Sequence, residues 1–141
     1  CKTHLANTGF FSVLVPFVEK DGRVHLLFEV RAKNMQSQPG EVCFPGGHVE
    51  RGENPRDTAL RETFEEIGVP IERIEVIGQG ILFTVMRTIP YSLIWGLFLR
   101  SVSTGKFGFT KRLTRIFLVP LEQFVENPPE VPQRKHLYRH R

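Results

Sequence analysis

The stretch Gly46–Val69, GGHVERGENPRDTALRETFEEIGV, has the signals of a glycine-led loop that runs into one short helix. Asn54 is a good N-cap, Pro55 suits the first helical position because no N–H is needed there, and Asp57 completes a capping pattern. Gly68 is a typical residue for ending a helix. The stretch therefore predicts a helix of about three and a half turns between these caps.

One side of the predicted helix is apolar and the other is acidic. Its apolar residues recur in steps of four and three positions, as expected for a stripe that packs on a core. They are Leu60, Phe64 and Ile67. Glu62, Glu65 and Glu66 lie three and four positions apart, so their carboxylates occupy neighbouring turns. We expect these carboxylates on the solvent side of the helix, with Glu53 in the loop before it.

Two explanations of the acidic side remain open. Like charges at these spacings cost only about 0.2–0.5 kcal/mol per pair on a solvated helix, so repulsion alone does not define a site. The side could be a plain acidic surface balanced by Arg56 and Arg61. Alternatively, a hard divalent cation, which takes oxygen ligands from carboxylates, backbone carbonyls and water, could cancel the repulsion.

The spacing of the charged residues favours the cation. Gly47 is followed after five residues by Glu53, and after seven more by the run Arg61–Val69, RETFEEIGV. This pattern resembles the signature of the Nudix hydrolases, with Thr63 at a position that is hydrophobic in the family pattern. The resemblance implies a Nudix-type α/β/α sandwich around a mixed β-sheet.

The glycines before the helix belong to the same prediction. Gly46 and Gly47 have no Cβ, so their backbone can take positive φ and approach a metal or a phosphate closely, although a tight turn alone would also use them. In the Nudix family the backbone carbonyl at this pair joins the carboxylates at the metal. The resemblance thus implies magnesium or manganese bound by Glu62, Glu65, Glu66 and Gly46, with both glycines also close to the substrate.

The resemblance also assigns catalytic roles to Glu62, Arg61 and Glu53. The arginine that matches Arg61 orients the glutamates in the family, and its spacing allows a pair with Glu65, which could also be a plain surface pair. A bound magnesium or manganese ion lowers the pKa of a water molecule, and either Glu62 or Glu53 would take the proton. The residues alone do not distinguish these two carboxylates as the base.

The segment Leu27–Gly47, LFEVRAKNMQSQPGEVCFPGG, narrows the expected substrate. It is similar to the extra motif of the coenzyme A diphosphatases within the Nudix family, which has Arg where this chain has Gln36 and usually Thr where it has Glu29. Arg31 could clamp a phosphate with its planar guanidinium, or could be a surface arginine at the end of a strand. The resemblance implies hydrolysis of coenzyme A or an acyl derivative to 4′-phosphopantetheine and adenosine 3′,5′-bisphosphate.

Length and composition indicate one ordinary globular domain. With 141 residues the chain is long enough for one domain with a core and too short for two. Cys1 and Cys43 show no pairing pattern, which favours a reducing compartment, and we expect a cytoplasmic protein. No apolar run has the length of a membrane span. We expect a single domain over 1–132 and a basic, mobile tail over 133–141.

The net charge of +4 favours anionic partners, either phosphorylated small molecules or nucleic acid. No acidic residue falls between Glu75 and Glu122. Many Nudix proteins supply a further carboxylate from this region of the chain. Glu122 could replace that carboxylate if the late helix begins near the site. The basic residues there are Arg87, Arg100, Lys106, Lys111, Arg112 and Arg115. They could form a face that binds nucleic acid, but we favour charges scattered at strand ends and a small-molecule substrate. Another Nudix substrate and a weakly active binding module remain alternatives.

Local patterns predict strands on both sides of the helix. The predicted strands cover residues 10–18, 24–31, 42–44, 89–102 and 115–119, and a second helix covers 121–126. Residues 20–23 predict a turn that joins the first two strands in a hairpin, and Pro16 suggests an edge strand or a bulge. Residues 71–77 could form a strand or a short helical turn. We expect a solvated His48 rather than a catalytic one.

Overall fold

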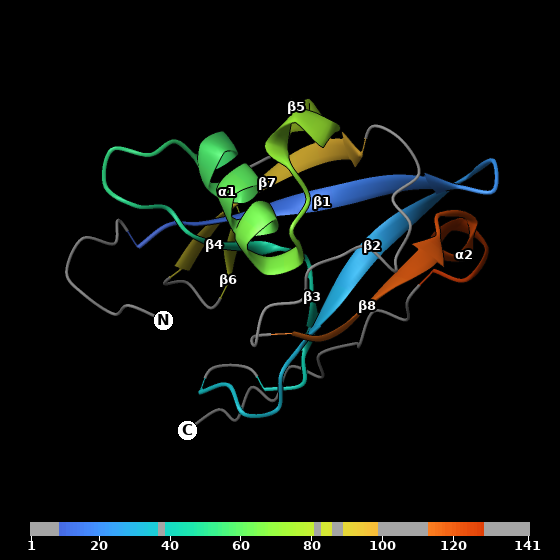
Figure 1. Cartoon of the computed structure of the whole chain (residues 1–141), viewed down its shortest axis with the longest axis horizontal. Helices are drawn as coiled ribbons and strands as arrows, with labels where there is room; N and C mark the ends of the chain where they lie inside the picture. The colour runs from blue at the N-terminus through green and yellow to red at the C-terminus, as the bar shows by residue number, and fades with distance from the viewer. Residues whose placement is uncertain (1–8, 37–38, 81–82, 86–88, 99–112, 129–141) are drawn as a thin grey trace, which may run out of the picture.

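The computed structural model describes residues 9–36, 39–80, 83–85, 89–98 and 113–128, which form one eight-stranded mixed sheet with helices packed against it. Strand β1 (Phe11–Lys20) lies in the middle, antiparallel to β2 (Arg23–Arg31) and parallel to β7 (Ile89–Phe98), as Figure 1 shows. The other strands are β3 (Val42–Cys43), β4 (Gly46–His48), β5 (Ile74–Gln79), β6 (Phe83–Val85) and β8 (Leu113–Pro120). The order is β3-β2-β1-β7-β5, with β4 on β1, β6 on β7 and β8 on β2.

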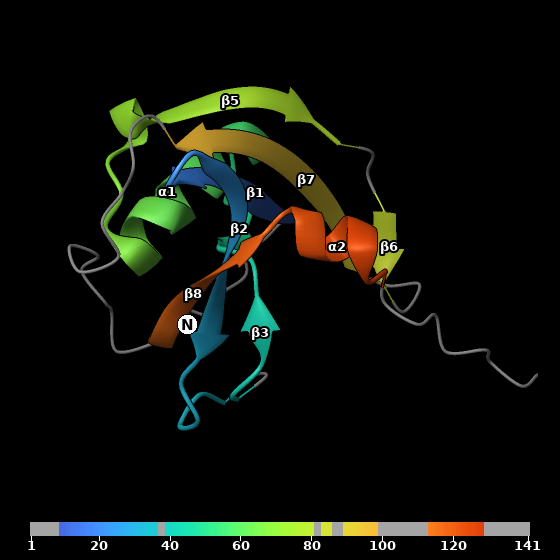
Figure 2. The same ribbon diagram turned by 90° about the vertical axis from the view of Figure 1, so that its right-hand side faces the viewer.

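Two α-helices, α1 (Pro55–Ile67) and α2 (Glu122–Glu126), cover opposite faces of this sheet (Figure 2). The alternation of side chains along β2 explains the layers. Leu27 is buried in the core beneath α1, whereas the next side chain, Phe28, lies on the other face with its ring centre 6.1 Å from that of Phe124 in α2. The predicted α/β/α sandwich around a mixed sheet is therefore confirmed.

The hairpin of β1 and β2 forms as predicted. Asp21 and Gly22 both have positive φ, 54° and 72°, which is the conformation that a tight two-residue hairpin turn requires. The expectation that Pro16 marks an edge or a bulge is wrong, because β1 is central and Pro16 is fully buried. On one side of β1 the partner changes from β4, which pairs up to Val13, to β2, which pairs from Phe17. Pro16 lies in the gap between these partners, where the sheet does not need its missing N–H.

The caps of α1 match the prediction. The Asn54 side chain accepts a hydrogen bond from the backbone N–H of Asp57 at 2.9 Å and donates one to its carboxylate at 2.8 Å. Gly68 ends the helix with a φ of 72°, and its N–H donates to the carbonyl oxygen of Phe64 at 2.9 Å. The Ser12 hydroxyl of β1 donates to the carbonyl oxygen of Pro55 at 2.6 Å, which fixes the first turn on the sheet.

The buried side of α1 differs from the predicted stripe. Leu60 and Ile67 are buried as expected, but Phe64 is 51% exposed. The helix instead faces the sheet with Ala59 and Thr63, both fully buried. The Thr63 hydroxyl donates to the Ala59 carbonyl oxygen at 2.7 Å, so a threonine fits a position that is otherwise hydrophobic in the family pattern without leaving an unpaired polar atom.

The remaining elements refine the predicted boundaries. Both alternatives for residues 71–77 are partly right, because a 3₁₀ turn, η1 (Ile71–Arg73), precedes β5. The predicted late helix and the strand before it are present as α2 and β8. Strand β7 covers most of the strand predicted at 89–102, whose last residues lie outside the described part, as does the predicted tail at 133–141.

Candidate metal-binding site at helix α1

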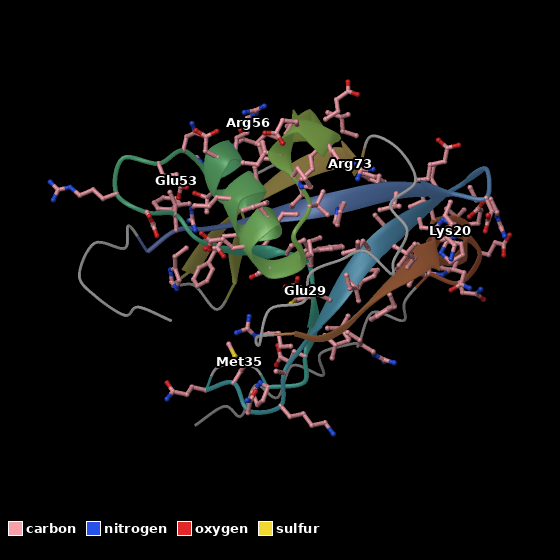
Figure 3. All side chains as sticks on the ribbon, viewed as in Figure 1. Lys20, Glu29, Met35, Glu53, Arg56 and Arg73 are labelled. Carbon is pink, nitrogen blue, oxygen red and sulfur yellow. The ribbon has the colours of Figure 1, made fainter. Side chains whose placement is uncertain are left out.

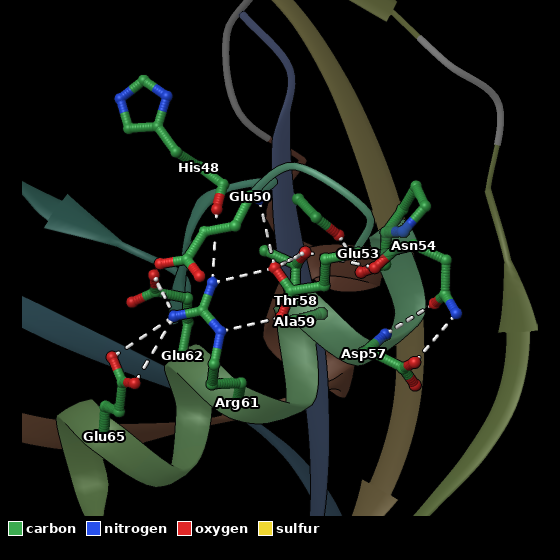
Figure 4. A network of polar contacts seen from close by, with 12 residues as sticks. His48, Glu50, Glu53, Asn54, Asp57, Thr58, Ala59, Arg61, Glu62 and Glu65 are labelled. Atoms are coloured by element: carbon green, nitrogen blue, oxygen red, sulfur yellow. Dashed lines mark hydrogen bonds and ion pairs between the residues drawn. The ribbon is translucent and has the colours of Figure 1, made fainter. Parts of the chain in front are cut away.

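Arg61 is the centre of a network of three carboxylates (Figure 4). Its Nε and Nη2 donate to the two oxygens of Glu53 at 2.8 and 3.0 Å. Nη1 donates to Oε1 of Glu62 at 2.9 Å and to both oxygens of Glu65 at 3.4 Å. The predicted pair with Glu65 is thus present, but the two-pronged bond to Glu53 has the better geometry. Nη2 also donates to the His48 carbonyl oxygen at 3.3 Å, which ties the network to β4.

Glu53 is held firmly in the loop before α1. Besides Arg61, its Oε2 accepts hydrogen bonds from the Thr58 hydroxyl at 2.6 Å and from the Glu50 backbone N–H at 3.2 Å. The hydrogen bonds from Arg61 are the main cause that lowers the pKa of Glu53 to about 2. A carboxylate with this pKa is a weak proton acceptor, so the geometry suits Glu53 to positioning Arg61.

Glu62 and Glu66 are buried, with exposed fractions of 9% and 4%, so the prediction of a solvent-facing acidic side is wrong for both. Only Glu65 of the three points outward, with a side chain that is 47% exposed. The side of α1 that carries Glu62 and Glu66 packs on β4, whose glycines have no side chains to hold the helix away. Sequence periodicity does not reveal this, because it reports the apolar stripe and not the shape of the neighbouring strand.

The glycine pair permits this close packing. Neither Gly46 nor Gly47 has a positive φ, so the expected use of that conformation is wrong. A Cβ on Gly47 would lie 2.5 Å from Cδ of Glu62, and a Cβ on Gly46 would collide with the backbone of β1 at Ser12. The Gly46 N–H donates to Oε2 of Glu66 at 3.3 Å. The pair therefore brings β4 into contact with both buried carboxylates.

Glu29 of β2 is a further buried carboxylate, which we did not predict as a site residue. It is 1% exposed and lies beneath α1 (Figure 3). Its carboxyl is close enough to that of Glu66 for the two to share a proton, and burial raises the pKa of both groups. The sequence carried one signal for it, a glutamate at a motif position where the related diphosphatases usually have threonine.

Cys43 and Arg31 lie next to Glu29. The Cys43 thiol donates to Oε1 of Glu29 at 3.6 Å, and burial raises the pKa of this thiol to about 12, so it stays protonated. Arg31 follows a register irregularity at the end of β2, and its positive charge lowers the pKa of Glu29 against the larger effect of burial. The predicted phosphate clamp is therefore close to the buried carboxylates rather than at a distant surface.

Two other candidates do not join the carboxylates. The His48 ring lies on the Phe11 ring, with centres 3.8 Å apart, and points away from the carboxylates in Figure 4, while burial lowers its pKa. Glu122 forms an ion pair with Arg23 at 3.3 Å beside the hairpin, so it does not replace the missing carboxylate. Of the basic residues in the middle stretch, the side chain of Arg115 is described, exposed on β8. The side chains of the others lie outside the described residues.

The donor chemistry of the site fits a hard divalent cation. Glu29, Glu62 and Glu66 are buried and interact electrostatically with one another, and Mg²⁺ and Mn²⁺ prefer carboxylate oxygens as ligands. As they stand in the structure, no three or more His, Cys, Asp or Glu side chains of the described residues are placed to hold a metal ion, so a bound cation would require these side chains to shift. Glu65 is turned toward Arg61, so of the four predicted ligands the structure brings together Glu62, Glu66 and the backbone of Gly46.

Comparison with known proteins agrees with this architecture. The NUDIX domain family matches residues 10–140. Peroxisomal coenzyme A diphosphatase NUDT7 of Mus musculus is 30% identical over 136 residues, covering 96% of this chain and 56% of that protein. Peroxisomal coenzyme A diphosphatase ndx-8 of Caenorhabditis elegans is 49% identical over 108 residues, covering 74% and 45%. A crystal structure of a C. elegans Ap4A hydrolase binary complex superposes with a TM-score of 0.67 at 17% identity, covering 82% of this chain and 83% of that one.

The chain belongs to the Nudix family, whose members are hydrolases that act on diphosphate bonds and use divalent metal ions. It spans about half the length of the two curated relatives, 56% and 45%. None of the helices in the described ranges has the length and the apolar character to cross a membrane.

Proposed function

We propose that this protein hydrolyses the diphosphate bond of a nucleoside diphosphate derivative, with coenzyme A or an acyl derivative as the substrate. The observation that carries the proposal is the pair of buried carboxylates, Glu62 and Glu66, held by Arg61 and by the backbone of Gly46. Buried carboxylates with few cationic partners are expensive, and a divalent cation removes that cost. The products would be 4′-phosphopantetheine and adenosine 3′,5′-bisphosphate.

In this proposal Glu62, Glu66, Glu65 and the Gly46 carbonyl hold Mg²⁺ or Mn²⁺. The bound ion would neutralise phosphate oxygens and lower the pKa of a water molecule. Glu65 would have to leave Arg61 to contribute, which its exposure and its long 3.4 Å contacts permit. Gly47 leaves room beside Glu62, so the backbone of β4 can lie next to both the carboxylates and the substrate.

Glu62 is the better candidate for the base that takes the proton from the water. Glu53 has both oxygens bonded to Arg61 and a pKa of about 2, so it would release its hydrogen bonds and accept a proton only at a high cost. Glu62 shares one oxygen with Arg61 at 2.9 Å and faces the glycine pair. Glu53 then acts by positioning Arg61.

The choice of coenzyme A rests on the Leu27–Gly47 motif and on the names of the two diphosphatase relatives. Arg31 lies near the carboxylates, where its guanidinium can bind a substrate phosphate. Gln36, which stands where the motif has arginine, favours a second candidate, another Nudix substrate such as a nucleoside triphosphate, dinucleotide or nucleotide sugar. The free thiol of Cys43 suits a reducing compartment such as the cytoplasm.

A hydrolysis panel tests the proposal. Coenzyme A, nucleotide sugars, dinucleoside polyphosphates and nucleoside triphosphates are incubated with the protein in Mg²⁺ or Mn²⁺, and the products are separated by chromatography. Coenzyme A should be cleaved, and Glu62→Gln and Glu66→Gln should each lower kcat by about a hundredfold or more. Glu75→Gln, an equal charge change at an exposed position of β5, is the control. Preferred cleavage of nucleoside triphosphates would favour the second candidate, and full activity in Glu66→Gln would refute the metal site.

A further inference from the structure

The carboxyl of Glu29 is buried without adequate hydrogen bonding. Its exposed fraction is 1%, and its Oε2 has no hydrogen-bond partner in the part of the chain that the structure describes. The other oxygen, Oε1, accepts from the Cys43 thiol at 3.6 Å, and a thiol is a weak donor. Buried polar atoms are almost always paired, so an unpaired carboxylate oxygen at this depth requires a physical reason.

The surroundings of Glu29 are negative. It faces the carboxyl of Glu66, which is 4% exposed, and the charge of Glu62 also acts on it. Arg31 is the cation that offsets part of this charge, but burial has the larger effect on the pKa of Glu29. Among the described residues, three glutamates thus lie near one another, with Arg31 acting on Glu29 and Arg61 bound to Glu62.

Two arrangements would relieve this crowding. The carboxyls of Glu29 and Glu66 could share one proton, or a cation could lie between them. The contacts around the pair favour the cation, because the Gly46 N–H already donates to Oε2 of Glu66 at 3.3 Å, whereas Oε2 of Glu29 has no hydrogen-bond partner among the described residues. A shared proton would not require a third carboxylate, Glu62, beside the pair.

We propose that Glu29 is an additional ligand of the divalent cation at Glu66 and Glu62, and that its unpaired Oε2 is the ligating atom. This inference rests on the proposed function, because it concerns the same site. A threonine at this position would give a neutral hydroxyl in place of a carboxylate. The chain has no acidic residue between Glu75 and Glu122, so β2 supplies here a carboxylate that this stretch does not.

The inference predicts a direct effect on metal binding. Mn²⁺ is titrated into the whole chain by calorimetry, and free Mn²⁺ is counted independently by electron paramagnetic resonance. Glu29→Gln, which keeps the shape but removes the charge, should weaken Mn²⁺ binding by about tenfold or more. Glu29→Thr should do the same, and it provides the comparison if the glutamine variant does not fold. Glu75→Gln is the matched control on an exposed strand position and should bind as the wild type does.

Thermal unfolding gives a second readout. A ligand that binds the folded state raises the midpoint of unfolding in proportion to the logarithm of its affinity. Saturating Mn²⁺ should therefore raise the midpoint less in Glu29→Gln than in the wild type and in Glu75→Gln. Equal shifts in all three proteins would argue for the shared proton.

The outcomes separate this inference from the proposed function. If the wild type binds Mn²⁺, Glu66→Gln does not, and both Glu29 variants bind within about twofold of the wild type, Glu29 is not a ligand and the proposed function stands. If the wild type itself binds no Mn²⁺, the metal site fails and the role of Glu29 fails with it. Weaker binding in both Glu29 variants, with an unchanged control, supports the inference.

Discussion

Two groups of carboxylates meet at Glu62, and they differ in what neutralises them. On one side Arg61 binds Glu53, Glu62 and Glu65 at distances of 2.8 to 3.4 Å, so this group carries its own cation. On the other side Glu29 and Glu66 face each other beneath α1, and Oε2 of Glu29 has no hydrogen-bond partner among the described residues. The first group has its cation within the chain, whereas in our proposal the second takes a divalent cation from solution.

The pKa values of the two groups move in opposite directions for this reason. The hydrogen bonds from Arg61 lower the pKa of Glu53 to about 2, while burial raises the pKa of Glu66. An opposite charge favours the ionised carboxylate, and removal from water disfavours it. The difference teaches that one acidic motif can place its carboxylates in two environments, one neutralised by an arginine and one buried beside other carboxyl groups.

The largest expected effect comes from displacing the side chain of Glu62, the residue at which the two groups meet. Gly47→Ala would place a Cβ 2.5 Å from Cδ of Glu62, and the side chain must move away. A shift of about 1 Å in a catalytic group can cost on the order of a hundredfold in rate, so we expect a loss of that size in kcat. The atoms that must move belong to a side chain and not to the backbone, but Glu62 is buried and bonded to Arg61, so we expect a cost of about 1 kcal/mol in unfolding free energy.

Gly46→Ala is the contrasting variant. Its Cβ would collide with the backbone of β1 at Ser12, which cannot move as a side chain can. We expect a loss of about 1–3 kcal/mol of stability from overpacking, measured by urea unfolding. If Gly47→Ala lost more stability than Gly46→Ala, the glycine at 47 would serve the fold and not the placement of Glu62.

An intermediate effect should follow removal of the Arg61 guanidinium, which is the cation of the first group. Arg61→Ala leaves Glu53 and Glu62 without their main donor, and losing a half-buried charged partner should cost about 2–3 kcal/mol of unfolding free energy. Arg56→Ala is the control on the same helix, because Arg56 and Asp57 form an exposed pair at 3.5 Å that is worth about 0–1 kcal/mol. Urea unfolding of both variants measures the two costs. Equal costs would show that the Arg61 group is an ordinary surface network.

The sequence predicted one of the two groups better than the other. Asn54, Glu53 and Arg61 lie within a few residues of one another along the chain, so caps, spacing and helix geometry define their contacts. The family signature added the roles of Glu62 and Glu66. These signals are local, and they sufficed for the helix, for the pair of Arg61 with Glu65 and, with the signature, for the fold class, whereas the two bonds from Arg61 to Glu53 were not predicted.

The buried pair was not predictable in the same way. The burial of Glu66 depends on how closely β4 approaches α1, and the place of Glu29 depends on the register of β2 within the sheet. Both are contacts between segments far apart in the chain. Periodicity along one helix gives no measure of them, and Phe64 was assigned to the core for the same reason although it is 51% exposed.

The smallest expected effect is a pH dependence that belongs to Glu53. Its folded pKa of about 2 lies below the ordinary value of 4.5, so the unfolded chain binds the proton more readily. The stability from Arg61 and Glu53 is therefore fully present above pH 4.5 and is lost as the pH falls from 4.5 toward 2. Urea unfolding between pH 6 and pH 3, in the presence of a chelator, should show this decline in the unfolding free energy. Glu53→Gln should be less stable than the wild type at pH 6, and its unfolding free energy should depend less steeply on pH. An equal slope in Glu53→Gln would mean that other carboxylates cause the acid sensitivity and that Arg61 does not distinguish the two groups.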